Sequence, residues 1–454
     1  MLESAKEYFK THKEKILKDY YSFLEFPSIA TDSSYTGEVQ RCADWLKKYL
    51  EDIGLSVEEW KSDGSSVLFA EKELSENRET LLLYCHYDVQ PVDPLELWET
   101  PPFEPNERDG YVYARGASDN KGQCFYTAVA LRAFLDHYKK LPVNLKFIIE
   151  GEEESGSASL SNLLEGKKKR LKADHLLVID SGIEDINTPM ITLGARGIVT
   201  FSLSVEEGKR DLHSGMVGGI AYNPNRALCE LLAQLHDSSG TVAVPGFYDE
   251  VVEMTPKEKH ELDFHFDEVS FERAYGFAPA GMEEGVSPLE ANWVRPTLEI
   301  NGISGGYSGE GFKTVVPARA EAKISCRLVP FQNPERIASL VVEFLRERIP
   351  SHLKLNIEVH RGNGRGFRES GSSRIAQLAA NAYSDVFQKG CKKILIGGSV
   401  PITVALKEAA GADTILIGTA LPDDAIHAPN ERFSLESFKK GYLTIYRLLE
   451  LFQH

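Results

Sequence analysis

Four short, continuously apolar runs limit the possible folds of this chain more than any other feature. They are "TLLLYCHYDV" (80–89), "VNLKFIIE" (143–150), "ADHLLVID" (173–180) and "ADTILIG" (412–418), and amphipathic helical segments lie between them. A strand that is apolar on both faces must be covered from both sides, and helices on a largely parallel sheet provide that cover. The pattern predicts an α/β fold with a mixed, mostly parallel sheet covered by helices.

The middle of the chain has strands of a different kind, with one polar face. "GIVTFSLSVEE", "RPTLEINGI", "ARAEAKISCRLVP" and "LKLNIEVH" alternate apolar with polar residues, and two amphipathic helices accompany them. The order strand, helix, strand, strand, helix, strand predicts a two-layer α+β unit. We expect a lid and dimerisation domain at 196–366, inserted into a catalytic domain of residues 1–195 and 367–454. Within the insert, the acidic segment 238–293 is too long for a plain loop.

Charge and cysteine content narrow the class of protein. The formal net charge is −17 at pH 7 and the basic residues are dispersed, which argues against nucleic acid and anionic membranes as partners. The N-terminal stretch alternates charged and apolar residues at helical spacing, so no signal peptide or membrane span is predicted and a cytoplasmic location is expected. Six cysteines without CxxC spacing are expected to be reduced core residues: Cys42, Cys85, Cys124, Cys229, Cys326 and Cys391.

A histidine and an aspartate stand at the end of the first apolar run. His86 and Asp88 are two residues apart, just before Pro91, and side chains at that spacing on a strand point to the same face. In an open α/β sheet this end of a strand faces the ligand crevice. A single His-x-Asp is more often structural than functional, so its meaning depends on what the other strands carry.

The other runs, and one glycine-flanked loop, also end in residues that bind metal ions. These residues are Glu152, Glu153, Glu154, Asp180, His427 and, in the loop "ARGASDNKG", Asp119. Taken singly, a run of glutamates is a solvated face and a terminal aspartate is a helix cap. Taken together, two histidines and three carboxylates exceed the needs of one structural zinc ion. They suit two adjacent Zn(II) or Mn(II) ions that share a carboxylate.

Six motifs resemble those of the dizinc aminoacylase and carboxypeptidase family, peptidase family M20, and its carnosinase-like cytosolic dipeptidase branch. They are "HYDVQP", "ARGASDNKGQ", "EGEEESGS", "IDSG", "DLHSG" and "HAPNERF", and the resemblance covers nearly the whole chain. It implies two divalent ions per subunit, zinc or alternatively manganese, with these ligands: His86, Asp119, Glu154, Asp180 and His427. Asp119 would bridge the ions, and one histidine would bind each. Asn120 departs from the family, because many members carry a second aspartate there.

The resemblance also implies how the neighbouring acids act. Glu153 would be the general base, and Asp88 would orient His86 and raise its basicity. A hydroxide that bridges two cations forms near neutral pH. Glu153 would take its proton as it attacks the carbonyl and later protonate the leaving amine. The implied reaction is hydrolysis of the amide bond of dipeptides or similar small peptides.

Four residues of the insert and of the last segment would bind substrate by the same resemblance. His213 in "DLHSG", in a loop after the first lid strand, would stabilise the oxyanion in the partner subunit's site, which requires a homodimer. Thr314, Arg327 and Ser399 would contact the substrate. Structural alternatives remain for each: His213 as a loop residue bonded to Asp211, Thr314 as a strand residue, Arg327 as a lid salt bridge and Ser399 as a turn.

Competing functions are less consistent with the sequence. "GISGG" at 302–306 fits the G-x-S-x-G pattern of a serine hydrolase, but a glycine-rich stretch and a strand follow it where a helix is needed. The motifs HExxH and GxxxxGK[ST] are both absent from the sequence. Their absence excludes the helix-based zinc proteases and the common nucleotide hydrolases, respectively. An inactive binding scaffold would usually have lost a ligand or the base, and all are present. An N-acyl amino acid deacylase or a carboxypeptidase with the same metals remains an alternative.

Overall fold

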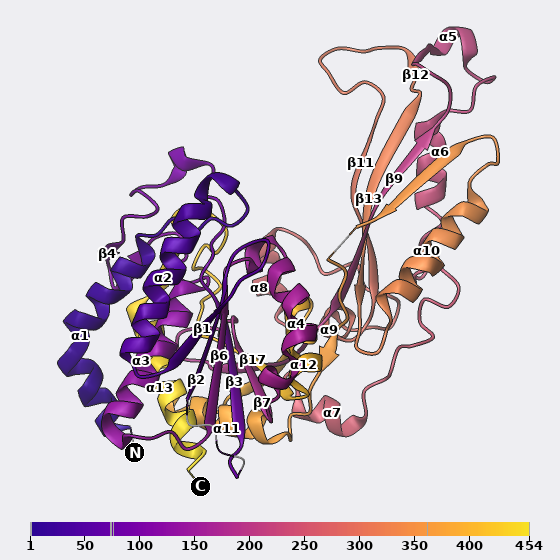
Figure 1. Cartoon of the computed structure of the whole chain (residues 1–454). Coiled ribbons are helices and arrows are strands. Elements are labelled where there is room, and N and C mark those ends of the chain that lie inside the picture. The colour runs from indigo at the N-terminus through magenta and orange to yellow at the C-terminus, as the bar shows by residue number, and fades with distance from the viewer. Residues whose placement is uncertain (1, 73–74, 76, 361, 454) are drawn as a thin grey trace.

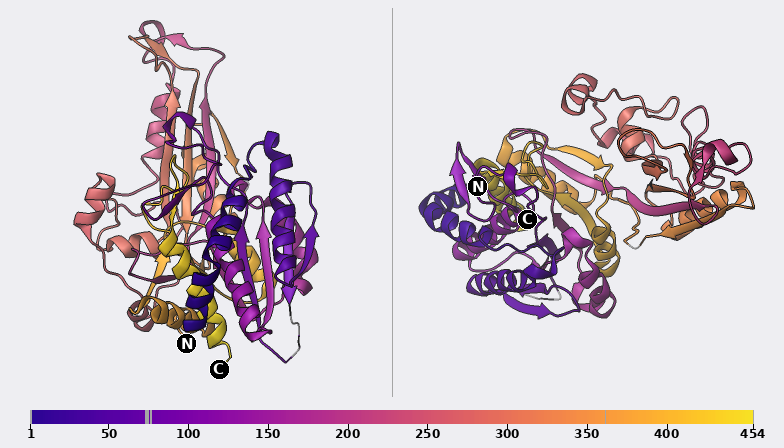
Figure 2. Two further views of the ribbon diagram at one scale, coloured as in Figure 1. Left: turned by 90° about the vertical axis from the view of Figure 1, so that its left-hand side faces the viewer. Right: turned by 90° about the horizontal axis from the view of Figure 1, so that it is seen from above.

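Two bodies of secondary structure make up the computed structural model, which describes residues 2–72, 75, 77–360 and 362–453 (Figure 1). One body, at the lower left of the figure, is a large sheet among helices, and it contains both ends of the chain. The other is built from the middle of the chain, and its long strands extend to the upper right. Seen from above, this second body stands to one side of the first (Figure 2).

The four predicted apolar runs are neighbours at the centre of the large sheet. In spatial order its strands are β1 (Ser56–Trp60), β2 (Val67–Lys72), β6 (Asn144–Glu150), β3 (Thr80–His86), β7 (His175–Ile179), β17 (Asp413–Ile417), β8 (Met190–Ala195) and β15 (Phe367–Arg368), with β16 (Lys392–Ile396) also on β8. β6, β3, β7 and β17 are mutually parallel. β1, β2, β8 and β15 pair in antiparallel fashion on either side. The predicted mixed sheet is confirmed.

Side chains of the central strands alternate between two hydrophobic cores. On β3, Leu81, Leu83 and Cys85 belong to one core, whereas Leu82 and Tyr84 belong to the other. The first core is covered by α1 (Glu3–Leu24), α2 (Thr36–Asp52), α3 (Lys121–Tyr138), α11 (Arg374–Phe387) and α13 (Leu435–Leu451). The second is covered by α4 (Ala158–Leu171) and α12 (Pro401–Ala410). Both faces of β3 are therefore buried from solvent, which explains its unbroken apolar sequence.

The insert is a second sheet with helices on one face only. Its strand order is β11 (Thr297–Gly305), β13 (Arg319–Leu328), β9 (Gly197–Glu206) and β14 (Lys354–Val359), and α6 (Pro224–Leu232) and α10 (Pro334–Arg348) cover it. Along β13, Ala320 and Ala322 are buried against these helices, while Glu321 and Lys323 are exposed. The predicted two-layer α+β unit is confirmed. Ser304 lies inside β11 with no helix after it, as expected from the exclusion of a serine hydrolase.

The chain crosses between the two sheets at two adjacent places. The passage from β8 to β9 lies beside that from β14 to β15, because Ile198 forms a β-bridge with Gly364. A Cβ atom on Gly197 would lie 2.4 Å from the carbonyl oxygen of Gly364, so this close approach requires glycine. From this change of sheet we propose that residues 196–366 form a separate lid domain and the rest of the chain the catalytic domain.

Smaller elements complete the molecule. The tip of the lid carries β10 (Leu212–His213), paired with β12 (Val315–Val316), and α5 (Ser214–Val217), as Figure 1 shows at the upper right. The predicted long segment holds α7 (Pro256–Glu261), α8 (Glu268–Tyr275) and α9 (Pro288–Trp293). A small sheet joins β18 (Arg432–Ser434), β5 (Tyr111–Tyr113) and β4 (Asn106–Arg108). Short 3₁₀ helices are η1 (Ser33–Tyr35), η2 (Leu95–Leu97) and η3 (Glu153–Ser155).

The cysteines correct one prediction. All six are free thiols, and four are buried as expected: Cys42, Cys85, Cys124 and Cys326. Cys391 is half-buried, and Cys229 is exposed. α6 directs Leu228 and Leu231 into the lid core, which leaves Cys229 on the solvent side of the helix. Burial was wrongly predicted for Cys229 because most residues of the helical stretch "ALCELL" are apolar, so the sequence does not show which of them face the core.

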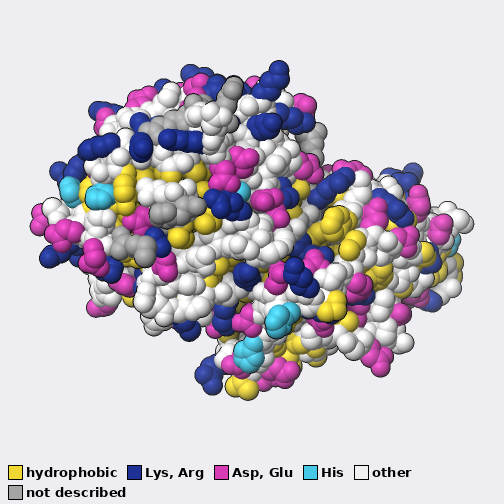
Figure 3. Space-filling view, turned by 90° about the horizontal axis from the view of Figure 1, so that it is seen from below, with side chains coloured by type: hydrophobic (Ala, Val, Ile, Leu, Met, Phe, Trp, Pro, Cys, Tyr) yellow, Lys and Arg dark blue, Asp and Glu magenta, His cyan; other side chains and the backbone are white. Residues whose placement is uncertain are grey.

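The surface mixes charges of both signs. In the view from below, basic side chains are interspersed with acidic ones over both bodies (Figure 3). Among the residues that the structure describes, no helix is both long and apolar enough to cross a bilayer.

Candidate active site

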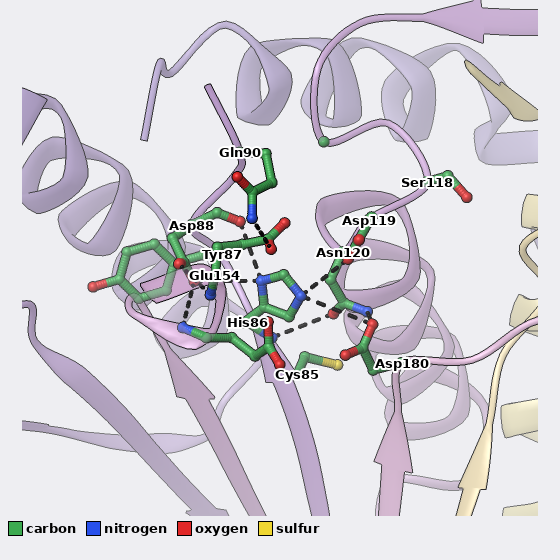
Figure 4. Close-up of polar contacts among 12 residues, drawn as sticks. Cys85, His86, Tyr87, Asp88, Gln90, Ser118, Asp119, Asn120, Glu154 and Asp180 are labelled. Atoms are coloured by element: carbon green, nitrogen blue, oxygen red, sulfur yellow. Dashed lines mark hydrogen bonds and ion pairs between the residues drawn. The ribbon is translucent and has the colours of Figure 1, made fainter. Parts of the chain in front are cut away.

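His86 and Asp180 come together because their strands are parallel neighbours. β3 ends at His86, Asp180 follows β7 directly, and the two strands pair in parallel, so both side chains leave the same edge of the sheet. Asp119 reaches this edge from the loop before α3. Nε2 of His86 lies 3.1 Å from Oδ1 of Asp119 and 3.8 Å from Oδ1 of Asp180 (Figure 4). These three residues form one group that could hold a metal ion.

A second group shares Asp119 with the first. Oδ2 of Asp119 lies 3.0 Å from Nε2 of His427, and the same nitrogen lies 3.2 Å from Oε1 of Glu154. In each group the candidate ligand atoms lie within 4.8 Å of one another. Asp119 offers one carboxylate oxygen to each group, which is the arrangement of a bridging ligand. The structure thus brings together all five residues predicted to bind metal.

His427 is held by a loop with unusual backbone angles. Ala425, His427 and Asn430 have φ values of 55°, 61° and 62°, and this left-handed region costs roughly 1–2 kcal/mol for a residue other than glycine. The Asn430 side chain accepts a hydrogen bond from the Glu99 amide at 2.8 Å and donates one to the Leu97 carbonyl at 2.9 Å. These bonds anchor the strained loop and keep the imidazole at the edge of the sheet.

Asp88 is buried behind His86, and its carboxylate has three contacts there. Its Oδ1 lies 3.3 Å from Nδ1 of His86, the side chain that we expect it to orient. Its carboxylate also accepts the backbone N–H groups of Glu153 at 3.2 Å and of Glu154 at 3.0 Å. One buried carboxylate therefore contacts a histidine of the first group and fixes the backbone that carries a ligand of the second.

Two amide side chains also hold candidate ligands, a role that was not predicted from the sequence. Gln90 donates from Nε2 to Oε2 of Glu154 at 2.7 Å, and Asn120 donates from Nδ2 to Oδ1 of Asp180 at 2.9 Å (Figure 4). Both lie inside motifs that carry ligands, which was the available signal. Asn120 therefore supplies a hydrogen-bond donor without adding a negative charge beside Asp180.

The three consecutive glutamates have different surroundings. Glu152 accepts the amides of Ser65 at 2.6 Å and Ser159 at 3.0 Å, so it joins the loop before β2 to the first turn of α4. The carboxylate of Glu153, by contrast, accepts no hydrogen bond among the described residues. Glu152 is therefore a structural residue, and Glu153 is free for chemistry.

Burial raises the pKa of Glu153 to about 9. His86 opposes this shift, while the carboxylates of Asp180, Glu154 and Asp119 add to it. With this pKa Glu153 holds a proton at pH 7 in the metal-free protein, so it must lose that proton before it can act as a general base, and nearby cations would favour the loss.

The carboxylates raise the pKa of both histidines. The carboxylates of Asp119 and Glu154, which lie 3.0 and 3.2 Å from Nε2 of His427, raise the pKa of His427 to about 10. Burial would lower the pKa of His86, yet its hydrogen bonds with carboxylates, Asp119 foremost, raise it well above its ordinary value. Burial would raise the pKa of Asp119, but the two histidines hold it below its ordinary value. Each histidine therefore holds a proton that must leave before its nitrogen can bind a metal ion.

The predicted substrate residues lie in two separate places. Thr314 and His213 are at the lid tip, where the Thr314 carbonyl accepts the Ser214 amide at 3.0 Å. This tip lies away from the large sheet of its own chain (Figure 1). Arg327 donates from Nη1 to Oγ of Ser399 at 2.8 Å, across the junction of lid and catalytic domain.

His213 has other surroundings than expected. It lies in the short strand β10 rather than in a loop, and its Nδ1 accepts the Gly215 amide at 3.0 Å. Asp211, its proposed structural partner, instead accepts the Ala318 amide at 3.1 Å.

Comparison with known proteins decides the family. Residues 82–451 match the model of peptidase family M20/M25/M40. The chain belongs to this family. It is 30% identical to the Cys-Gly metallodipeptidase of Schizosaccharomyces pombe over 97% of this chain and 96% of that protein. It is 31% identical to the Beta-Ala-His dipeptidase of Homo sapiens over 97% of this chain and 90% of that protein.

A solved structure supports the same assignment. An M20 family metallo-carboxypeptidase from Sulfolobus solfataricus superposes with a TM-score of 0.86 and 32% identity, covering 96% of this chain and 99% of that one. The predicted family, its dipeptidase branch and the fold are confirmed. The chain is therefore a peptidase of the M20 family.

The two groups fit divalent cations, which M20 metallopeptidases use. Imidazole and carboxylate ligands without thiolate suit Zn(II) or Mn(II). Oε1 of Glu154 is buried and accepts no hydrogen bond, although His427 lies 3.2 Å from it. When His427 loses its proton, as metal binding requires, this buried carboxylate oxygen is costly unless a cation binds it. The residues present therefore fit a site for two cations that share Asp119.

Metal binding to this M20 site is expected to release protons. His427 has a pKa of about 10 and is protonated at pH 7, so the apparent dissociation constant should rise about tenfold for each proton displaced when the pH falls by one unit. In the metal-free protein, the interaction of protonated His427 with its neighbouring carboxylates also stabilises the fold. This contribution is fully present below about pH 6.5, the ordinary pKa of histidine in the unfolded chain. That contribution is lost as the pH rises toward 10. Calorimetric titration with Zn(II) in buffers of different ionisation enthalpy counts the protons, and a count of zero at pH 7 would contradict the assignment.

Proposed function

We propose that this M20 protein hydrolyses the amide bond of dipeptides and similar small peptides with two divalent metal ions. The observation that carries the proposal is the membership of Asp119 in both ligand groups, with one carboxylate oxygen in each. The two relatives named above are a Cys-Gly metallodipeptidase and a Beta-Ala-His dipeptidase, which supports dipeptides as the substrate class. We propose zinc as the metal and manganese as the alternative, since both accept these ligands.

The residues around the site suggest how the bond is broken. Two bound cations would act as Lewis acids toward the scissile carbonyl and lower the pKa of a water molecule. We infer that Glu153 is the general base, because it lies beside the ligands without belonging to either group. It takes a proton from the attacking water and returns it to the amine that leaves as the C–N bond breaks. Asp88 holds His86 and the backbone of Glu153 in place meanwhile.

Arg327 and Ser399 are proposed to bind the carboxylate of the peptide. Neither Arg327 nor the neighbouring Arg196 forms an ion pair with any residue that the structure describes. Burial lowers the pKa of Arg327, and burial together with Arg327 lowers that of Arg196 to about 10. Two guanidinium groups without an acidic partner favour an anion between them and the solvent. A terminal carboxylate is the anion that a dipeptide supplies.

His213 and Thr314 are proposed to complete the site of a second subunit. Nδ1 of His213 accepts a hydrogen bond, so Nε2 carries the proton and can donate to an oxyanion. The lid sheet also leaves one face uncovered, with a groove of about 600 Å³ and with Ile300 and Ile303 exposed by 41% and 57%. Such a face is suited to pack against a second copy of the chain. A cytoplasmic homodimer remains the predicted form.

A carboxypeptidase with the same metals is the second candidate. The similar Sulfolobus solfataricus structure is of a metallo-carboxypeptidase, which is the specific observation in its favour. An N-acyl amino acid deacylase has no comparable support. The two reactions need the same cations and the same base, so they differ only in how much peptide lies before the scissile bond.

A substrate panel with metal analysis tests the proposal. We expect the purified protein to bind two divalent ions per chain and to lose activity to a chelator, with recovery on adding Zn(II) or Mn(II). Free dipeptides should be cleaved at least about tenfold faster than N-acetyl or N-succinyl amino acids and longer blocked peptides, a difference of about 1.4 kcal/mol in transition-state binding. Full activity in metal-depleted protein would exclude the mechanism. A preference for long peptides would favour the carboxypeptidase.

A further inference from the structure

The loop that carries His427 also carries a buried acid that belongs to neither metal group. Glu431 is 1% exposed, and both of its carboxylate oxygens are fully used. Oε2 accepts Nη1 of Arg115 at 2.8 Å and the Gly116 amide at 2.9 Å. Oε1 accepts the amides of Ser118 and Asp119, each at 3.0 Å. A buried carboxylate is costly unless donors satisfy it, and here all four donors come from one short loop.

That short loop is the one that ends in the bridging residue. Its backbone amides at Gly116, Ser118 and Asp119 turn toward a single carboxylate, so the direction in which the Asp119 side chain leaves the loop is fixed by Glu431. The Ala114 amide also donates to the Glu431 carbonyl at 3.1 Å. The contacts therefore join the Asp119 loop to the His427 loop at both the backbone and the side chain.

A second buried acid strengthens the same junction from the other side. Asp424, which is 0% exposed, accepts the Ser118 hydroxyl at 2.8 Å, and its carbonyl accepts the Arg432 amide at 2.9 Å. Glu431 and Asp424 flank the strained segment with His427 at its centre. The distance between His427 and Asp119 is thereby set by a hydrogen-bonded frame and not by the two side chains alone.

We propose that Glu431 is a positioning residue for the metal centre, which holds Asp119 and His427 at the separation that a shared ion needs. The inference rests on the proposed function, because it requires that these two residues bind metal. It assigns no contact of Glu431 with metal or substrate. Residues behind metal ligands commonly change metal affinity or activity by about 10–100-fold when they are altered.

Glu431→Gln tests the inference with little change in shape. The amide would turn an NH₂ group toward two N–H donors, so the loop must shift and Asp119 with it. Glu369→Gln is the matched control, since Glu369 is also a nearly buried acid that accepts one lysine ammonium, from Lys407, and two backbone amides, from Thr414 and Ser370. It belongs to neither metal group. The measurements are Zn(II) affinity by chelator competition and the visible absorption of the Co(II)-substituted protein.

We expect Glu431→Gln to raise the Zn(II) dissociation constant by about 10–100-fold and to change the Co(II) spectrum, with part of the activity recovered in excess metal. Glu369→Gln should keep both metal readouts at the wild-type values even if its melting temperature falls. Wild-type affinity and spectrum in Glu431→Gln would overturn the inference while leaving the proposed function intact. A wild-type protein that binds no metal would instead defeat the proposed function.

Glu431→Asp covers the case in which the glutamine variant is not recovered in folded form. Aspartate keeps the charge but is one methylene shorter, so it can reach only one of the two pairs of donors. It too should weaken Zn(II) binding by about tenfold or more, and unchanged binding in this variant would also overturn the inference.

Discussion

Replacing Glu153 by glutamine is expected to lower kcat by about a hundredfold or more while two divalent ions stay bound. The amide has nearly the shape of the carboxylate but cannot accept the proton of the attacking water. Because Glu153 belongs to neither ligand group, its loss leaves both groups intact. Steady-state kinetics on a dipeptide, together with metal analysis of the same sample, give both quantities.

Glu154→Gln is the matched comparison, one residue further along the same 3₁₀ helix. Glu154 belongs to the group with Asp119 and His427, so its substitution should release metal and lose activity as a consequence. Excess metal should then restore part of the activity of Glu154→Gln and none of that of Glu153→Gln. Metal lost at position 153 and retained at position 154 would reverse the roles that we assign.

Replacing His213 by alanine is the second large expected effect. Removal of a hydrogen-bond donor to an oxyanion typically costs about 10²–10³-fold in kcat, and we expect a loss of this size with metal content and oligomeric state unchanged. His213 lies on β10 at the lid tip and contacts neither metal group of its own chain among the described residues. A structural role for the residue would show as a lower melting temperature and not as a selective loss of kcat.

Complementation between two inactive variants tests whether His213 acts in the partner's site. A heterodimer of His213→Ala and Glu153→Gln chains has one site with an intact base and an intact partner histidine. Mixing the two variants under conditions where subunits exchange should therefore restore up to about half of the wild-type activity per dimer, since one of two sites is whole. Exchange without recovered activity would mean that His213 acts within its own chain or has no catalytic role.

The central sheet and the grouping of the candidate metal ligands were predictable because burial on both faces leaves little freedom in the sequence. Leu81 and Leu82 on β3 face opposite cores, so both must be apolar and the run is continuous. His86 interrupts this apolar run at the end of the strand, and it becomes a candidate ligand because other strands also end in polar residues. Since parallel strands end at one edge, polar residues at the ends of β3 and β7 must meet.

Contacts between distant segments could not be predicted in this way. Arg327 and Ser399 touch because Arg327 pairs with Ile198, where the chain crosses between the two sheets, and no local pattern records that approach. From its sequence neighbours alone, Glu431 would be expected to be exposed. It is buried because the Asp119 loop packs against it. The position of His213 at the far tip likewise depends on how far the paired strands β9 and β13 extend from the large sheet. The alternation of apolar and polar residues predicts these strands but not their direction.

The order of strands in the large sheet also bears on how the protein is made. β17 lies between β7 and β8, yet the whole lid is synthesised before it. The lid strands and helices are contiguous in the sequence, so the lid can complete its core while the ribosome still holds the last part of the chain, as domains generally fold in units. The large sheet, by contrast, cannot be completed until β17 has been synthesised and inserted between β7 and β8. His427, the last of the five proposed ligands in the sequence, follows that strand, so a nascent chain cannot assemble the proposed metal centre before β17 and the loop after it have been synthesised.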